Sequence, residues 1–162
     1  MPFDIEIREL GRDDWRLKKE LRLAALIDSP ASFMGSYSNA AVRDENAWRD
    51  WMSSGIALAA FDAGSAIGLA GGHRPPHLAG HAEVVSMWVA PTHRGRRVAG
   101  ALLDRIVAWA AANDDPGVYL EFVATNDAAR ATYERHGFVA TDEPAGMANA
   151  VVMRRALARQ AV

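Results

Sequence analysis

The stretch EVVSMWVAPTHRGRRVAGALL, residues 83–103, decides the fold. Its first half is apolar on both faces, as a central strand of a sheet is, and Pro91 then ends the strand because proline has no amide hydrogen to donate. Apolar residues return at helical spacing from Val98 to Ile106. The stretch therefore predicts a buried strand, a tight turn and a helix.

The turn between this strand and helix is rich in positive charge. Arg94, Arg96 and Arg97 surround Gly95 and come directly before the helix. The first amides of a helix have no partner within the helix, and the helix dipole is positive at that end. These features predict a site for an anion, such as the phosphates of a nucleotide-like cofactor.

The turn contains neither GxGxxG nor GxxxxGK[ST]. It resembles RxxGxG or RxxGxA, the pyrophosphate loop of the GNAT superfamily of N-acetyltransferases, with Arg94 first, Ala99 last and VAP just before it. Arg97 stands where the family has its central glycine. We expect a helical backbone there, which does not require glycine, and therefore an altered affinity rather than lost binding. The resemblance assigns coenzyme A binding to Trp88, Val89, Arg94, Gly95, Arg96, Arg97, Val98, Ala99 and Gly100.

A second segment, ATNDAARATYERHGF (residues 124–138), matches the NxxAxxxYxxxGF pattern that closes the coenzyme site in the same superfamily. Asn126 and Tyr133 are two helical turns apart, so they lie on one stripe with Ala129 between them. Ordinary roles remain open, with Asn126 as a helix N-cap and Tyr133 as a packing residue. The resemblance implies that Asn126 and Ala129 bind the pantetheine arm and that Tyr133 protonates the departing thiolate.

Length and patterning predict one domain. Half of the 162 residues are hydrophobic, which suffices for a single core. Together with the resemblance, the length and the hydrophobic pattern predict a single α/β domain over 1–162, with acceptor-side helices in 1–55 and the acetyl-CoA-binding core in 81–145. We expect a central mixed, mostly antiparallel sheet of about seven strands flanked by helices, in the order βααβββαβαββ. The strands are expected at 3–8, 56–61, 66–73, 83–89, 118–123, 138–142 and 150–157, and the helices at 13–27, 44–52, 98–113 and after Asn126.

Composition narrows the partners. The net charge of −2 and the pI near 6.2 argue against a nucleic-acid binder, since the arginine cluster is local. Cysteine is absent, which excludes disulfides and a cysteine nucleophile and favours direct acyl transfer. The histidines lack metal-ligand spacing, so we expect no metal. The longest apolar run is too short to cross a bilayer and the start of the sequence is charged, so we expect a cytoplasmic protein without membrane partners. We also expect the protein to be a monomer or a homodimer.

Acylation of an amine requires a group that accepts the amine's proton. Glu83 is the first candidate, because the resemblance places it where several superfamily members keep a catalytic glutamate six residues before a valine. His81 and Glu121 are alternatives that act through water, and Glu83 also fits a solvated carboxylate at a strand end. The resemblance further implies that a backbone amide near Val89, where the strand diverges from its neighbour, stabilises the developing oxyanion.

The sequence says least about the chemical identity of the acceptor amine. The resemblance places one wall of the acceptor cleft in the segment with Phe33, Tyr37, Trp48 and Trp51, although the two tryptophans also fit simple core packing. We expect transfer of an acetyl group from acetyl-CoA to the primary amine of a small molecule. A peptide or protein amine, or a catalytically weak acyl-CoA sensor, remains an alternative. A closed pocket would favour the small amine, and an open groove a peptide.

Overall fold

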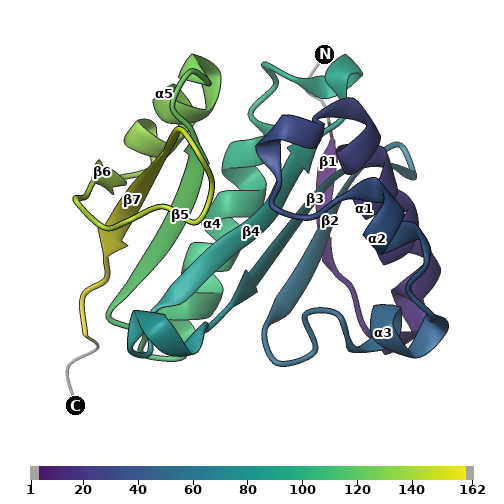
Figure 1. Ribbon diagram of the computed structural model, residues 1–162, viewed down its shortest axis with the longest axis horizontal. Coiled ribbons are helices and arrows are strands. Elements are labelled where there is room, and N and C mark those ends of the chain that lie inside the picture. The colour runs from purple at the N-terminus through teal and green to yellow at the C-terminus, as the bar shows by residue number, and fades with distance from the viewer. Residues whose placement is uncertain (1–3, 160–162) are drawn as a thin grey trace.

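The computed structural model describes residues 4–159, which form one sheet flanked by helices (Figure 1). The seven strands run in the order β1-β2-β3-β4-β5-β7-β6. Neighbours are antiparallel except for β4 and β5, which are parallel. The expected α/β class and the mixed, mostly antiparallel sheet are thus confirmed. The strands are β1 (Ile5–Glu9), β2 (Ile56–Asp62), β3 (Ser65–His73), β4 (Ala82–Val89), β5 (Gly117–Val123), β6 (Val139–Ala140) and β7 (Ala150–Ala156).

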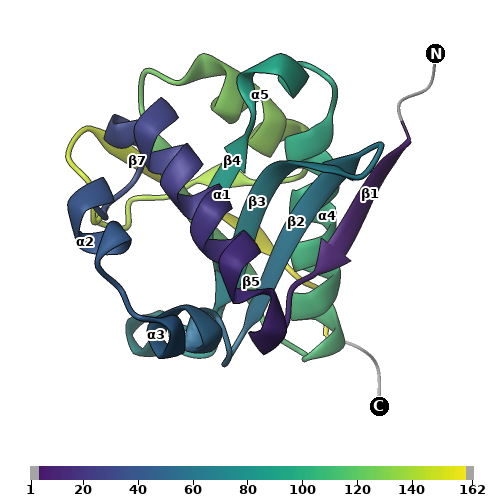
Figure 2. The ribbon, with the colours of Figure 1, turned by 90° about the vertical axis from the view of Figure 1, so that its right-hand side faces the viewer.

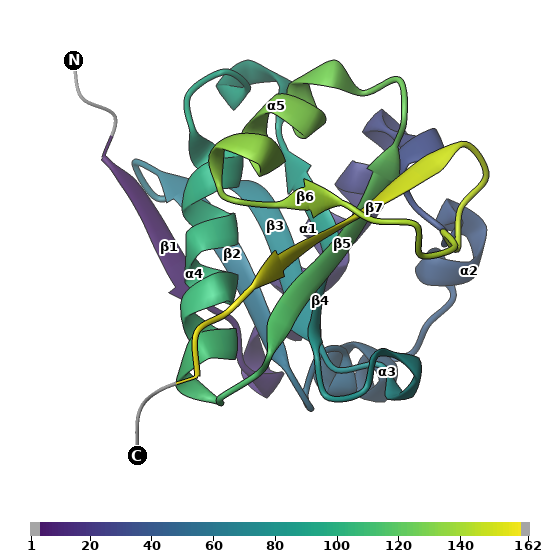
Figure 3. The ribbon, with the colours of Figure 1, turned by 90° about the vertical axis from the view of Figure 1, so that its left-hand side faces the viewer.

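The helices cover both faces of the sheet. Helices α1 (Trp15–Asp28), α2 (Tyr37–Ala41) and α3 (Glu45–Asp50) lie on one face, and α4 (Val98–Ala112) and α5 (Asp127–Arg135) on the other (Figures 2 and 3). A 3-10 turn, η2 (Pro30–Ser32), follows α1. Within residues 4–159, no helix is both long and apolar enough to cross a membrane.

The structure differs from the expectation mainly at two elements, and most other boundaries shift by one or two residues. Helix α2 was expected as loop, so the order βααβββαβαββ lacks one short helix; the Ser36 hydroxyl caps this helix by accepting the Asn39 amide at 3.2 Å. Strand β6 has two residues rather than the five expected at 138–142. The expected start of the first strand, residue 3, lies outside the described residues.

Each face of the sheet has its own apolar core. Leu102, Leu103 and Ile106 of α4 are fully buried against the strands. On the opposite face, Leu21 and Ala25 of α1 pack on the sheet in a second cluster. Apolar side chains therefore cover both faces of the sheet.

Strand β4 is irregular at its centre. Ser86 and Met87 together lie opposite the single residue Ala70, so β4 carries one extra residue in its ladder with β3. Ser86 has a φ of 57°, in the left-handed region that side chains other than glycine rarely adopt. The extra residue is a β-bulge, which bends and twists its strand.

Strands β4 and β5 are paired only at their beginnings. Their register is confined to Ala82 with Val118 and Glu83 with Tyr119. Beyond these pairs the two strands diverge toward their C-terminal ends (Figure 1). The sheet therefore contains a V-shaped gap between β4 and β5.

The strain at the bulge leads to a first prediction. Ser86→Gly should raise the free energy of unfolding by about 0.5–1 kcal/mol, because glycine adopts a positive φ without steric cost. Ser86→Val should lower it, since a β-branched residue fits this conformation poorly. Urea denaturation measures both changes.

Ser65 provides the matched control, because it lies in the extended strand β3. Glycine there should lower stability slightly, as glycine does within strands. Equal effects of glycine at the two serines would contradict the assignment of strain to Ser86.

Candidate active site

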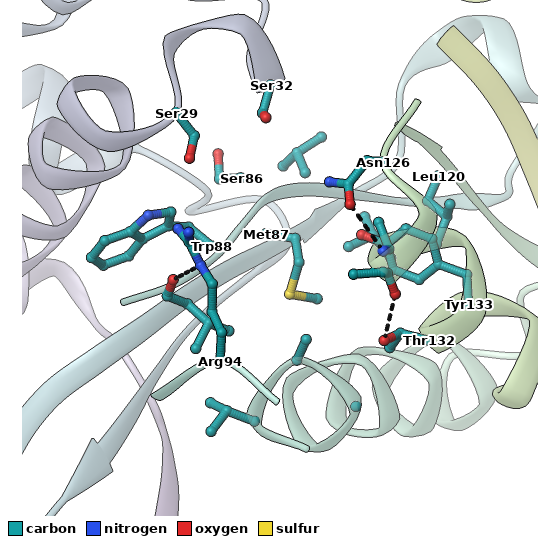
Figure 4. Close-up of a pocket in the computed structure, with 18 of the residues that line it drawn as sticks. Ser29, Ser32, Ser86, Met87, Trp88, Arg94, Leu120, Asn126, Thr132 and Tyr133 are labelled. Atoms are coloured by element: carbon teal, nitrogen blue, oxygen red, sulfur yellow. Dashed lines mark hydrogen bonds between the residues drawn. The ribbon is translucent and has the colours of Figure 1, made fainter. Parts of the chain in front are cut away.

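A cleft of about 1240 Å³ lies where β4 and β5 diverge. In Figure 4, Trp88 and Arg94 lie on one side of it, Asn126 and Tyr133 on the other, and Met87 between them. Every predicted site residue except Arg96 lines this cleft, namely Glu83, Trp88, Val89, Arg94, Gly95, Arg97, Val98, Ala99, Gly100, Asn126, Ala129 and Tyr133.

The start of α4 supplies free amides to the cleft. The first backbone bond of the helix runs from the Ala101 amide to the Arg97 carbonyl at 3.1 Å. Within the described part of the chain, the amides of Val98, Ala99 and Gly100 donate to no protein group. Together with the positive end of the helix dipole, they form a site suited to a phosphate.

The backbone of this loop corrects one expectation. Arg97 has a φ of 64° and is the left-handed N-cap of α4, so the expected helical backbone is wrong. Gly95 also has a positive φ, of 75°. The conformation at residue 97 is the one that glycine adopts most easily, which explains physically why the family has glycine at this position.

Gly100 allows the end of α5 to approach the first turn of α4. A Cβ at this residue would lie 2.7 Å from Nε2 of His136. His136 Nδ1 lies 2.8 Å from Oδ1 of Asp104, which fixes the ring. His136 and Asp104 both line the cleft. The sequence analysis missed them, because residues 32 positions apart gave no local signal.

Arg94 is held by two groups. Its Nε donates to the Val89 carbonyl at 3.0 Å, and its guanidinium pairs with Asp28 at the end of α1. The Trp88 indole also donates to Asp28, at 3.0 Å. The hydrogen bonds from Trp88 and Ser29, with a smaller contribution from Arg94, lower the pKa of Asp28. This contact ties α1 to the loop and could not be predicted from the sequence.

The Val89 amide faces the gap in the sheet. The next amide, of Ala90, donates to Ile67 in the direction of β3 at 2.8 Å. Successive amides of a strand point to opposite edges, so the Val89 amide points toward β5. No ladder with β5 exists at this level. The Val89 amide is therefore a donor directed into the cleft.

Asn126 and Tyr133 of the α5 stripe each have the ordinary structural role that the sequence left open, and both also line the cleft. Asn126 caps the helix, with its Oδ1 accepting the Ala129 amide at 3.1 Å, and it also lines the cleft. The Tyr133 ring packs on Phe122 and Phe138, with centroids 5.4 and 6.3 Å away. Burial raises the pKa of Tyr133 to about 12. Within the described residues its hydroxyl makes no hydrogen bond, and it remains protonated at neutral pH.

Two carboxylates line the cleft on the sheet side. Glu83 Oε1 lies 3.2 Å from Nε2 of His73, a neighbour that the sequence analysis did not identify. Glu121 Oε2 accepts the Gly146 amide at 2.7 Å. His81 lies outside the lining, where Nδ1 contacts the Leu78 carbonyl and Nε2 contacts Arg154. Glu83 and Glu121 are thus better placed than His81 to accept a proton.

Of the four aromatic residues expected in the acceptor wall, Phe33 lines the cleft. Trp48 is fully buried in a cluster with Leu26 and Ala40, and Trp51 packs beside it, so core packing describes both tryptophans. Tyr37 is exposed outside the lining.

Two other segments meet beside Glu121. The Met34 sulfur after η2 lies 3.2 Å from the position of a Cβ on Gly146. The Gly146 amide is in turn bound to Glu121. Among residues 4–159, no cluster of three or more histidine, aspartate or glutamate side chains is arranged to hold a metal ion.

Comparison with solved structures shows the same fold. A Salmonella typhimurium protein, yncA, solved with its cofactor acetyl-CoA, is 17% identical with a TM-score of 0.75, over 98% of this chain and 96% of that one. The PaiA N-acetyltransferase of Thermoplasma acidophilum, in complex with coenzyme A, is 17% identical with a TM-score of 0.69, over 95% and 99%. A GCN5-related N-acetyltransferase from Kribbella flavida is 22% identical with a TM-score of 0.71, over 94% and 98%.

No curated protein matches this chain. The family model described as the acetyltransferase (GNAT) family matches residues 22–138, which is most of the chain. That range contains the strand, the loop and the α5 stripe that form the cleft. The chain belongs to the GNAT family of acetyltransferases.

Proposed function

We propose that this protein transfers the acetyl group of acetyl-CoA directly to the primary amine of a small molecule. Family membership supports acyl transfer. The contact of Met34 with Gly146, whose amide binds the cleft carboxylate Glu121, supports a small acceptor, because it narrows the cleft beside Glu121. The proposal keeps two expectations from the sequence, a cytoplasmic location and a monomeric or homodimeric state.

The residues of the cleft fit acetyl-CoA. Two proteins of the same fold hold acetyl-CoA or coenzyme A. Here the free amides of Val98, Ala99 and Gly100 would bind the pyrophosphate. Asn126 would bind the pantetheine amide beside the small residue Ala129. The coenzyme supplies an acetyl group already activated as a thioester.

The proposed reaction balances in protons and bonds. Glu83, directly or through water, takes a proton from the acceptor's ammonium group, and the freed amine bonds to the acetyl carbon. The Val89 amide stabilises the negative charge that develops on the carbonyl oxygen. The carbon–sulfur bond breaks, and the Tyr133 hydroxyl gives its proton to the sulfur. The nitrogen releases its second proton through water, which restores the Tyr133 hydroxyl, and Glu83 passes the first proton to solvent. The products are an N-acetylated amine and a free thiol.

The broad experiment is a thiol-release assay with acetyl-CoA and a panel of polyamines, amino acids, aminoglycosides and short peptides. Turnover with a small amine is expected. Turnover with peptides alone would overturn the small-molecule acceptor. Acetyl-CoA binding without turnover of any amine would indicate that the protein is an acyl-CoA sensor and would overturn the proposed reaction.

Arg97→Gly should be tolerated. It removes the strain of a positive φ, worth about 1 kcal/mol, which corresponds to roughly 2–4 °C in Tm for a chain of this size. Coenzyme affinity, measured by calorimetry, should remain within a few-fold of the parent, because the free amides of Val98, Ala99 and Gly100 are unchanged.

Arg97→Ala is the matched control, since it removes the guanidinium but keeps the strained conformation. It should leave the Tm near that of the parent. Steeply weakened coenzyme binding in both variants would instead show that the Arg97 side chain contacts the phosphates.

Glu83→Gln should slow acetylation mainly at low pH, by about 10²-fold or more, because the reaction then depends on amine already deprotonated in solution. The rate should recover as the pH rises. Glu121→Gln, which alters the second carboxylate on the sheet side of the cleft, should keep the parent's profile. If Glu121→Gln shows the pH-dependent loss and Glu83→Gln does not, the base is Glu121.

Tyr133→Phe should lower kcat by about 10²-fold, near the lower end for general acid catalysis, because a thiolate is a fairly good leaving group. The ring packing remains, so the dissociation constant for coenzyme should hardly change. With a pKa of about 12, Tyr133 should cause no fall in the parent's rate below pH 10. Weakened coenzyme binding with full turnover at saturation would make Tyr133 a packing residue only.

A further inference from the structure

Arg22 in α1 lacks a partner for its charge. It makes no hydrogen bond and no ion pair with any residue in the range 4–159, and its Nη1 is completely buried without an acceptor. Buried polar groups in folded proteins are almost always hydrogen-bonded. An unpaired, partly buried cation opposes folding, so its retention calls for a physical explanation.

The groups around Arg22 do not offset the cost of burying its charge. Its guanidinium stacks 4.8 Å from the centre of the Phe33 ring, which holds it in place but accepts no hydrogen bond. Burial, followed by the positive charge of Arg43, lowers the pKa of Arg22. The site therefore has a positive potential and a fixed guanidinium, with no carboxylate of the described chain against it.

Arg22 lies in the wall of the cleft that α1 and the segment after it form. It lines the cleft together with Phe33 and Met34, and its Nη2 lies 3.1 Å from the position of a Cβ on Gly35. Met34 continues this wall to Gly146, whose amide binds Glu121. The cleft lining thus includes a cation on α1 and two carboxylates, Glu83 and Glu121, on β4 and β5.

This arrangement of charge is complementary to a zwitterion. We propose that Arg22 binds a carboxylate of the acceptor, so that the acceptor is an amino acid or another small amine that carries a carboxylate. The inference rests on the proposed function. The guanidinium charge is delocalised over its planar fork, so a carboxylate bound at the edge that faces the cleft offsets the burial of the whole group.

The test compares each amino acid with its amide and with the amine that lacks the carboxylate, using leucine, methionine and phenylalanine. The parent should show a kcat/KM on the order of 10- to 100-fold higher for the amino acid, the range expected of a charged hydrogen bond. Arg22→Gln should abolish this preference through KM and leave the uncharged amines and the KM for acetyl-CoA unchanged. Arg22→Lys should keep part of it.

Arg16→Gln is the matched control, because Arg16 is an exposed arginine on the same helix. It should retain the parent's preference. A parent that prefers the uncharged amines, or an Arg22→Gln variant that loses activity equally on charged and uncharged members, would overturn the proposal.

Two readouts separate this inference from the proposed function. Calorimetry of leucine binding, with coenzyme A present, requires no turnover: binding by the parent and loss in Arg22→Gln supports the role of Arg22 even if no amine is acetylated. Thermal unfolding of Arg22→Met should give a Tm equal to or above that of the parent, since an unpaired cation is removed. A clearly lower Tm would make Arg22 a structural residue and overturn the proposal.

Discussion

The left-handed backbone at Ser86 is the constraint on which the cleft depends. Side chains of a regular strand alternate between faces, yet Val84 and Val89, five residues apart, both pack in the core under α4. The extra residue of the bulge makes this possible, and it places the Trp88 ring in the core under α1. The same shift directs the Val89 amide into the gap. One strained residue thus affects the two cores, the direction of the Val89 amide and the contact of Trp88 with Asp28.

Local patterns predicted much of the site. The strand and helix of residues 83–103 and the stripe of Asn126 and Tyr133 depend on spacing alone, and spacing is preserved when a chain folds. Arg97 shows the limit of such patterns. An arginine side chain does not indicate a positive φ. The only signal was the glycine that the family has at this position, because glycine adopts a positive φ more easily than other residues.

The remaining features arise from contacts that no local pattern encodes. Asp28 meets Trp88 and Arg94 across 60 and 66 residues, and His73 meets Glu83 across a strand connection. Arg22 has no hydrogen-bond or ion-pair partner among residues 4–159, and this depends on all the side chains that pack around it. Functional details of this kind depend on tertiary packing, which explains why the sequence predicted the reaction class better than the acceptor.

The short contact between β4 and β5 has a consequence for the stability of the folded chain. With two register pairs, the halves of the sheet are joined at one end, and a coenzyme bound to the loop, Val89 and Asn126 would bridge them where backbone bonds are missing. A ligand that binds the folded state alone adds about 2.7 kcal/mol at 100 times its Kd. Resistance to unfolding and proteolysis would then rise and fall with the supply of acyl-CoA, so that abundance of the enzyme follows its substrate.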